Sequence, residues 1–541
     1  MASMNRRRAL GALAGSVLLQ GCCCNRPFPE PGIALGGGPM ATEPAFLRAP
    51  ARGRAAAPQP YCVDVHTHFF NASDVTVKGY IEGPMAHSMP GQLGNLLRAL
   101  APLAEALAEL APTAAKEYKD LDELVGQARV LNADAMEQTL AARVNSERIT
   151  LSREFFRLIS RPDGRDFVEK YNSIKSSTPR ALRGAYPEIN KLDETSVINA
   201  MRLGESLDAR RPLKGALADD GSFYAEGVLA FIGYMLSSRW ANLRSYQQAF
   251  SGPDSKLNVD CALSSLVDFD RWLDCPPRSA HEDQMRLHAR LSKLSAGYMK
   301  PLISYNPWTD VVNGGAALRL VNQAVTEFGF VGVKIYPPNG FRPWGNTAEQ
   351  DGFGLPSHRA INDALEKFWD LCIKLDVPVM AHTNHSMGKD QKHDELGGPQ
   401  GWAKLAEKYE AKAPRVNLGH FGGSKGAWNA QMANIMSSSS GGARMYGDLG
   451  FWTELRCGEG SVEDCTLAAE NLRQVMALSL KNGIERVVDR VMFGSDWLML
   501  SHAKGWKSYA NDLYETLGTI ASPDDLKKIF GGNARNCFKL T

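Results

Sequence analysis

Two histidines stand one residue apart at the end of a short β-branched run, VDVHTHFF, which begins at Val63. In a strand, residues two apart face the same side, so His66 and His68 should point together. Asp64 should share their face, and Val63 and Val65 should occupy the other. Two converging imidazoles can hold one metal ion, because neutral imidazole nitrogens are good ligands for zinc and similar ions. A lone His-x-His pattern is weak, so matching residues are needed elsewhere.

Polar residues also end other apolar runs. VPVMAHTN ends its run at His382, VNLGHFGG at His420 and VMFGSDWL at Asp496. In FVGVKIYPP the apolar residues alternate with Lys334, so that lysine should face the opposite side from them. Each residue alone is better explained as a satisfied core or loop residue. Because they recur together at equivalent positions, we favour a shared metal site.

The elements that carry these residues alternate along the chain. A first strand-like run covers residues 61–66, and from Val259 onward apolar runs alternate with amphipathic helical patterns, giving eight strand candidates. Such alternation predicts an α/β fold, a TIM (β/α)8-type barrel, whose active sites gather at the carboxyl ends of the strands. A doubly wound open sheet is the competing architecture, but no Gly-rich phosphate loop appears between a strand and a helix.

The domain organisation follows from composition. Residues 1–21 are expected to be an export signal, 22–60 a Pro-, Gly- and Ala-rich flexible linker, and 61–541 the barrel domain. Patterns such as QLGNLLRALAPLAEALAEL predict a large helical insertion after the first strand, at about residues 75–255. Its most apolar run is too short to cross a bilayer.

The whole chain has the composition of a globular protein. Its 541 residues are 44% hydrophobic and 22% charged, with a formal charge of +2. This balance gives no reason to expect nucleic acid as a partner, so a small molecule is the expected substrate. Two cysteine pairs, Cys261 with Cys275 and Cys457 with Cys465, are close enough to form disulfides in an oxidising compartment, although buried free thiols are an equally good interpretation.

The N-terminus has the features of an export signal. An arginine cluster at residues 6–8 precedes a short apolar run and the fragment LQGC, which ends at Cys22. The fragment resembles a bacterial lipoprotein cleavage box, and the arginines resemble a twin-arginine signal. We therefore expect a protein anchored by a lipid on Cys22 to a bacterial membrane, in the periplasm or at the cell surface. The alternative is a disordered basic N-terminus of a cytosolic enzyme.

Several motifs, taken in order, resemble one known family. VDVHTHFF, GFVGVKIYPP, PVMAHTN, NLGHFGG, RVMFGSDW and IFGGNARNCF resemble the amidohydrolase superfamily, and within it the amidohydrolase-2 group of TIM-barrel metal-dependent hydrolases and decarboxylases. The resemblance covers about residues 61–68 and 259–540. The helical stretch between them has no counterpart in the family pattern.

The resemblance implies a role for each residue. His66 and His68 would be first-strand ligands of a divalent ion, His382 the fifth-strand ligand and Asp496 the eighth-strand carboxylate. His420 would bind a second ion or act on the substrate. The ion, expected to be zinc, lowers the pKa of bound water from about 15.7 towards 7, and Asp496 would take a proton from that water.

Lys334 bears on whether one or two ions are present. In two-metal members of the superfamily a fourth-strand lysine is often carboxylated to form an anionic bridge, and KIYPP resembles that setting. An ammonium beside two dications would be repelled, so a bridging lysine must be modified or neutral. The alternative, an unmodified Lys334 paired with an acid or a substrate carboxylate, is equally supported.

The resulting expectation is a metal-dependent hydrolase that acts on an amide, ester, lactone or similar bond of a small polar substrate. The nearest alternative is a non-oxidative decarboxylase of the same superfamily. A different class of alternative is a non-catalytic surface lipoprotein that uses the barrel for binding. Tyr336, Asn384, His385 and Trp497 directly follow strand ends and are candidates to line the pocket, with ordinary loop packing as the alternative.

Overall fold

The computed structural model describes residues 43–50 and 61–82, residues 101–162 without 103, the single residues 165 and 169, and much of 225–540. Within the last range the gaps are 253–254, 256, 274–275, 354–355, 387–390 and 459–460. The expected export signal at 1–21 and Cys22 lie outside the described residues, as does most of the expected linker.

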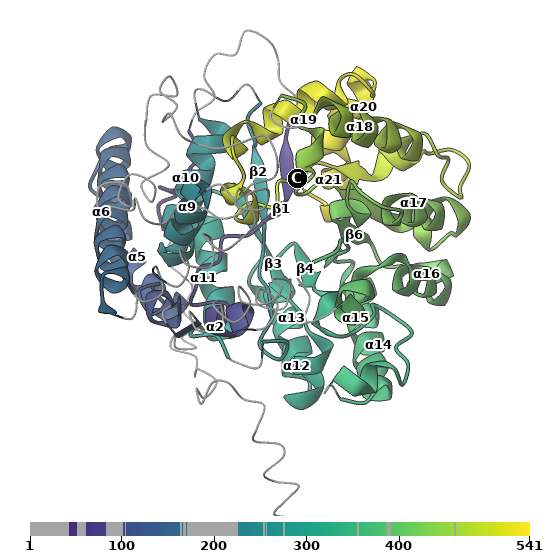
Figure 1. Cartoon of the computed structure of the whole chain (residues 1–541), viewed down its shortest axis with the longest axis horizontal. Helices are drawn as coiled ribbons and strands as arrows, with labels where there is room; N and C mark the ends of the chain where they lie inside the picture. The colour runs from purple at the N-terminus through teal and green to yellow at the C-terminus, as the bar shows by residue number, and fades with distance from the viewer. Residues whose placement is uncertain are drawn as a thin grey trace, which may run out of the picture.

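Eight strands form one parallel sheet in which neighbours in the sequence are neighbours in space. They are β1 (Val63–Thr67), β2 (Cys261–Ser265), β3 (Met299–Ser304), β4 (Gly332–Ile335), β5 (Val379–His382), β6 (Val416–Gly419), β7 (Met445–Asp448) and β8 (Val491–Met492). The last strand returns to the first: Val65 N donates to Phe493 O over 3.1 Å, and Asp496 N donates to His66 O over 2.7 Å. The expected TIM (β/α)8-type barrel is confirmed (Figure 1).

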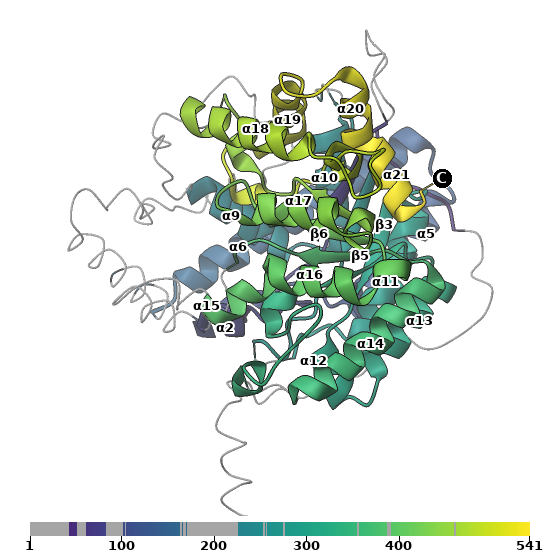
Figure 2. The ribbon, with the colours of Figure 1, turned by 90° about the vertical axis from the view of Figure 1, so that its right-hand side faces the viewer.

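Helices surround this sheet (Figures 1 and 2). They are α11 (His281–Leu294), α12 (Pro307–Val312), α13 (Ala316–Glu327), α14 (His358–Leu375), α15 (Gln391–Asp394), α16 (Pro399–Lys408), α17 (Trp428–Ser438), α18 (Val462–Met476), α19 (Tyr509–Leu517), α20 (Pro523–Lys527) and α21 (Asn533–Phe538). Local sequence explains their ends: Ser522 caps α20 by accepting from Asp525 N over 3.1 Å, with Pro523 in the first turn.

The first strand departs from the expected alternation. Val63 and Val65 belong to a buried cluster that joins side chains from several strands to Phe538 of α21, so they face the barrel interior. Asp64 points out of the barrel, where it accepts a hydrogen bond from Tyr246 Oη over 2.6 Å. The pairing with β2 is irregular between Asp64 and Thr67. A bulge of this kind reverses the facing of the residues that follow, so His66 also faces inward.

The described part of the expected insertion consists mostly of helices. Between β1 and β2 lie α2 (Val77–Tyr80), α5 (Ala114–Ala128), α6 (Ala133–Ile159), α9 (Ala225–Leu236) and α10 (Arg239–Ser251). Figure 1 places α5, α6, α9 and α10 together on one side of the barrel. Arg239 has no exposed surface and pairs with Asp74, just after β1, and with Glu117 of α5. None of the helices described here has the length and apolar character needed to span a bilayer.

Part of the expected flexible linker is packed against the barrel. Leu47 is fully buried, and its backbone N–H donates to Leu294 O over 2.9 Å. Gln247 of α10 donates to Leu47 O over 2.9 Å, and Arg290 pairs with Glu43 over 2.7 Å. One apolar side chain, one backbone hydrogen bond from Gln247 and one ion pair with Arg290 thus hold residues 43–50 of this segment against the barrel domain.

The two candidate cysteine pairs differ. Cys457 and Cys465 form a disulfide. Cys261 is a buried free thiol, so the expected alternative of a free thiol applies to it, and Cys275 lies outside the described residues.

Candidate metal centre

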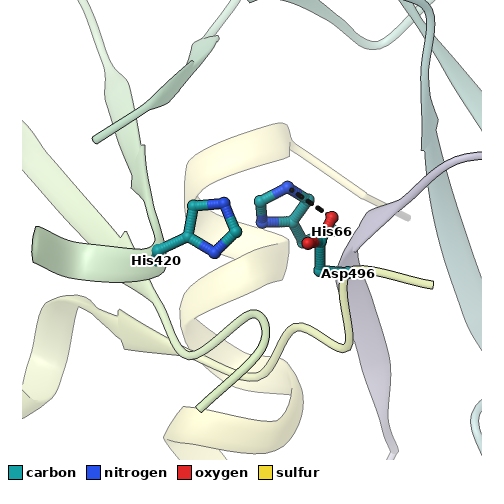
Figure 3. A group of neighbouring side chains, drawn as sticks. All are labelled: His66, His420 and Asp496. Carbon is teal, nitrogen blue, oxygen red and sulfur yellow. Dashed lines mark ion pairs between the residues drawn. The ribbon is translucent and has the colours of Figure 1, made fainter. Parts of the chain in front are cut away.

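The six candidate residues gather at the carboxyl ends of their strands. His66 lies in β1, Lys334 in β4 and His382 ends β5. His420 directly follows β6, and Asp496 lies a few residues beyond Met492, the end of β8. His66, His420 and Asp496 each offer one ligand atom, and these three atoms lie within 4.8 Å of one another. Figure 3 shows these three side chains facing a common space. Residues from strands far apart in the sequence are thus brought together as the barrel rule predicts.

The remaining candidates extend this group without a break. His68 Nε2 lies 3.4 Å from Asp496 Oδ1, the same distance as His66 Nε2. His382 Nδ1 lies 3.1 Å from His420 Nε2, and Lys334 Nζ lies 3.4 Å from His66 Nε2. All but His382 are almost completely buried. The structure therefore brings all six residues into one cluster.

The backbone at two of these positions is unusual. His420 and Asp496 have φ angles of 66° and 57°, in the left-handed region that side chains other than those of Gly, Asn, Asp and His rarely adopt. Such conformations persist only where the surroundings enforce them, and they concentrate at functional sites. Here they lie beyond the ends of β6 and β8, where both side chains face a common space with His66 (Figure 3).

In each of the four histidines, the ring nitrogen that faces away from the centre donates a hydrogen bond to an oxygen acceptor. His66 Nδ1 donates to Asp448 Oδ1 over 3.0 Å, His68 Nδ1 to Ser265 O over 2.9 Å, and His420 Nδ1 to Gly450 O over 2.8 Å. His382 Nε2 donates to Asn384 O over 2.9 Å. Since a carbonyl or carboxylate oxygen only accepts, the outer nitrogen of each ring carries the proton. The inner nitrogen of each neutral ring is therefore bare.

This arrangement fits a cation. The bare nitrogens His420 Nε2 and His382 Nδ1 face each other over 3.1 Å, and the bare nitrogens of His66 and His68 face the Asp496 carboxylate. Lone pairs and a carboxylate pointed at one another repel unless a positive charge lies between them. Metal-binding histidines are commonly held in this way, with the second nitrogen donating to a carbonyl or carboxylate. The donor set of imidazoles and one carboxylate is that of zinc and related ions.

The charge states agree with this assignment. Burial lowers the pKa of His66 to about 4 and the pKa of His382 well below its ordinary value, so both rings are neutral at pH 7. Burial by itself raises the pKa of Asp496, but the surrounding imidazoles outweigh it and hold the pKa below its ordinary range. Neutral rings and an ionised carboxylate are the forms that bind a metal.

Lys334 faces inward, as its alternation in the sequence predicts. Burial lowers its pKa to about 8, although the Asp496 and Asp448 carboxylates oppose the change. About a tenth of the lysine is thus uncharged at pH 7, and the uncharged amine is the form that reacts with carbon dioxide. Its amine is also close enough to His66 Nε2 to hydrogen-bond it when unmodified.

Asp448 is a functional residue that the sequence patterns do not single out. It ends β7 and is fully buried. Its Oδ1 accepts from His66 Nδ1 and from the backbone N–H groups of His420 and Gly450, and its Oδ2 accepts from Asn417 Nδ2. One carboxylate thus orients two of the candidate ligands. The signal was present in MYGDLGFW, where a strand-like run ends in an acid at the position that elsewhere carries a histidine or aspartate.

The four candidate pocket residues separate into different environments. The Tyr336 ring lies 4.6 Å from the His382 ring, so this residue does border the centre. Asn384 contributes its carbonyl to His382. His385 is exposed and pairs with an aspartate on α15. Trp497 is fully buried among aromatic rings behind Asp496, so ordinary packing explains it.

Fold and site together define a parallel (β/α)8 barrel with a histidine- and aspartate-rich centre at the carboxyl ends of its strands. A family model described as Amidohydrolase matches residues 285–540. This range contains four of the six candidate residues, namely Lys334, His382, His420 and Asp496. Over this range, the chain is similar to the amidohydrolase family.

Several solved structures are similar to the barrel. A probable 2-pyrone-4,6-dicarboxylic acid hydrolase from Acinetobacter baumannii is 13% identical over 52% of this chain and 84% of that one, with a TM-score of 0.33. A zinc-bound amidohydrolase from Burkholderia multivorans is 12% identical over the same shares, also with a TM-score of 0.33. A 2,6-dihydroxybenzoate decarboxylase from Rhizobium is 17% identical over 48% and 77%, with a TM-score of 0.29. No curated protein matches the chain.

Proposed function

We propose that this protein is a metal-dependent hydrolase that cleaves an amide, ester, lactone or similar bond of a small polar substrate. The observation that carries the proposal is the convergence of bare imidazole nitrogens on the Asp496 carboxylate, with their outer nitrogens fixed by hydrogen bonds. His66, His68, His382, His420 and Asp496 would hold the ion. When bound, a divalent ion supplies a positive charge that polarises the scissile group and lowers the pKa of water.

We assign to Asp496 the proton transfer that hydrolysis requires. Its Oδ1 faces His66 and His68, and its Oδ2 accepts no hydrogen bond from the described residues. The carboxylate is ionised at neutral pH, so Oδ2 can take a proton from an attacking water and return it to the leaving group. Asp448 keeps the His66 ring in one tautomer while this happens.

The test is the Asp496→Asn variant of the full chain. We expect turnover to fall by about 10²–10⁴-fold, the usual contribution of a positioned acid–base group, while the fold is kept. Asp525→Asn is the matched control, because it removes a carboxylate that pairs with Arg486 on the outside of the barrel. Near-normal turnover in Asp496→Asn would contradict the assignment of Asp496.

The class of reaction is tested with a substrate panel. Lactones and esters should release acid, whereas aromatic carboxylates should not release carbon dioxide; the reverse result would make the protein a decarboxylase. Metal analysis of the purified protein should find one or two divalent ions per chain, and intact mass should show whether Lys334 carries a carbon dioxide adduct. Absence of metal together with chelator-insensitive turnover would contradict the proposal.

We also propose that the protein is exported and anchored through a lipid on Cys22. The Cys457–Cys465 disulfide supports an oxidising compartment, since disulfides rarely persist in the cytosol. Mass spectrometry of the N-terminal peptide from the native host should find a lipid-modified Cys22 as the first residue. An intact N-terminus in the soluble extract would contradict the proposal.

A further inference from the structure

Two carboxylates and an imidazole form a second cluster at the carboxyl end of the barrel, apart from the metal centre. Asp268 and Asp270 lie in the loop after β2, and His281 is the first residue of α11. His281 Nε2 lies 3.0 Å from Asp270 Oδ2 and 4.0 Å from Asp268 Oδ2. Each of the three residues offers one ligand atom, and these atoms lie within 4.8 Å of one another. The second cluster therefore has the residue types and the spacing of a metal site.

Two buried oxygens from neighbouring loops border the second cluster. Thr309 belongs to α12, after β3, and its hydroxyl lies beside the Asp268 carboxylate. Asn339 ends the short helix η3 (Pro337–Asn339), after β4, and donates from Nδ2 to Asp268 O over 2.7 Å. The two residues are 6% and 1% exposed, yet Thr309 Oγ1 and Asn339 Oδ1 make no hydrogen bond of ordinary geometry with the described residues. Buried oxygens in this state indicate a ligand that the side chains surround.

The charges of the second cluster do not balance in the metal-free protein. Burial lowers the pKa of His281, but the Asp270 carboxylate outweighs it and raises the pKa to about 10, so the ring carries a proton at pH 7. Burial and then repulsion from Asp270 raise the pKa of Asp268 to about 6, so most of this carboxyl is also ionised. Two buried negative charges thus share one positive charge, and a further positive charge would stabilise them.

We propose that the second cluster, Asp268, Asp270 and His281, binds a divalent metal ion. The Thr309 hydroxyl is its neutral fourth ligand. Ligand atoms held about 2.0–2.2 Å from one ion lie about 3.0–3.5 Å apart, so the observed separations need only a small closing movement. The ion replaces the proton between His281 and Asp270, which passes to water, and two carboxylates then balance its charge. Oxygen donors with one imidazole suit zinc or manganese.

The position of this ion gives it a structural role beside the metal centre. Phe269 lies between the two aspartates in the sequence, and its ring is 4.8 Å from the Tyr336 ring. Tyr336 in turn lies 4.6 Å from the His382 ring. An ion in the second cluster therefore holds the loop after β2 against a residue that borders the metal centre. This role does not depend on the class of reaction that the barrel performs.

The test is zinc binding by the metal-free full chain at pH 7, measured by equilibrium dialysis and elemental analysis. We expect Asp270→Asn to bind one zinc ion per chain fewer than the wild type, because an amide cannot replace the charge of the carboxylate. Asp525→Asn, which loses a carboxylate on the outside of the barrel, should bind as many ions as the wild type. The comparison counts ions, so the difference remains even if the barrel proves not to be a hydrolase.

A second variant, Thr309→Val, separates a ligand from a residue that only packs. Valine removes a buried hydroxyl, so the metal-free variant should be at least as stable as the wild type in thermal unfolding. Its affinity for the zinc ion that Asp270→Asn lacks should fall by about 2–10-fold, a loss comparable to that of one neutral hydrogen bond. A threonine that only packs would leave the zinc affinity unchanged.

Equal zinc stoichiometry in the wild type and in a folded Asp270→Asn variant would overturn the proposal. If Asp270→Asn does not fold, Asp268→Asn takes its place in the same measurement. Its amide oxygen can still accept the Asp270 N–H, which lies 3.3 Å from Asp268 Oδ1. Unchanged zinc affinity in Thr309→Val would remove the fourth ligand and would also overturn the site as proposed.

Discussion

Replacing Asp448 with Asn separates the charge of this residue from its shape. Its Oδ1 accepts from His66 Nδ1, His420 N and Gly450 N over 3.0, 3.0 and 2.9 Å. An amide oxygen can keep these three bonds. The new amide nitrogen would then face Asn417 Nδ2, now 2.8 Å from Oδ2, but Asn417 Oδ1 is buried and has no partner. A half-turn of the Asn417 amide presents that oxygen, so the variant should fold.

What the variant loses is the negative charge that polarises the His66 ring. A hydrogen bond to a charged acceptor contributes roughly 1.5–3 kcal/mol and a neutral one roughly 0.5–1.5 kcal/mol, so the expected loss is about 1–2 kcal/mol. This corresponds to a metal affinity about 5–30-fold lower, which overlaps the range found when a hydrogen-bond partner of a metal ligand is replaced. Turnover at limiting metal should fall by the same factor and recover when metal is added in excess.

The assay is competition for zinc against a chromogenic chelator at pH 7, with thermal unfolding of the metal-free protein measured in parallel. Asp525→Asn is the control, since it removes a carboxylate far from the centre that pairs with Arg486. It should retain wild-type zinc affinity. A folded Asp448→Asn protein that also binds zinc as tightly as wild type would refute the role assigned to Asp448.

Three further predictions concern stability. The Asp270 carboxylate 3.0 Å from His281 outweighs the effect of burial and raises the histidine's pKa to about 10, so its stabilising contribution is complete below about pH 6.5 and is lost as pH rises towards 10; unfolding titrations of His281→Asn should lack this decline. Replacing Cys457 and Cys465 with Ser should lower the free energy of unfolding by about 2–3 kcal/mol in denaturant melts, and equal stability would contradict this. Arg239→Met should cost about 3–5 kcal/mol in the same assay, because two buried carboxylates lose their partner, whereas a neutral effect would show that they are protonated.

The local sequence was sufficient to predict the barrel and to identify the residues that cluster in it. Strand-forming runs that alternate with amphipathic helices leave few ways to bury all the apolar faces, and a closed parallel sheet is the one that the chain adopts. Because every strand of such a sheet runs in the same direction, a polar residue at each carboxyl end is brought to one face. His382, His420 and Asp496 could thus be grouped from sequence, although they lie far apart along the chain.

The tertiary structure determined the facing of Asp64 and the protonated nitrogen of each histidine, which the alternation of residues in the sequence could not predict. The irregular pairing of β1 turned Asp64 outward to Tyr246, because a bulge depends on the neighbouring strand and not on the alternation within the run itself. The protonated nitrogen of each histidine was set by acceptors from other strands and loops, such as Asp448 and the Gly450 carbonyl. Hydrogen-bond partners of this kind exist only once the chain is folded, and they determine which lone pairs face the centre.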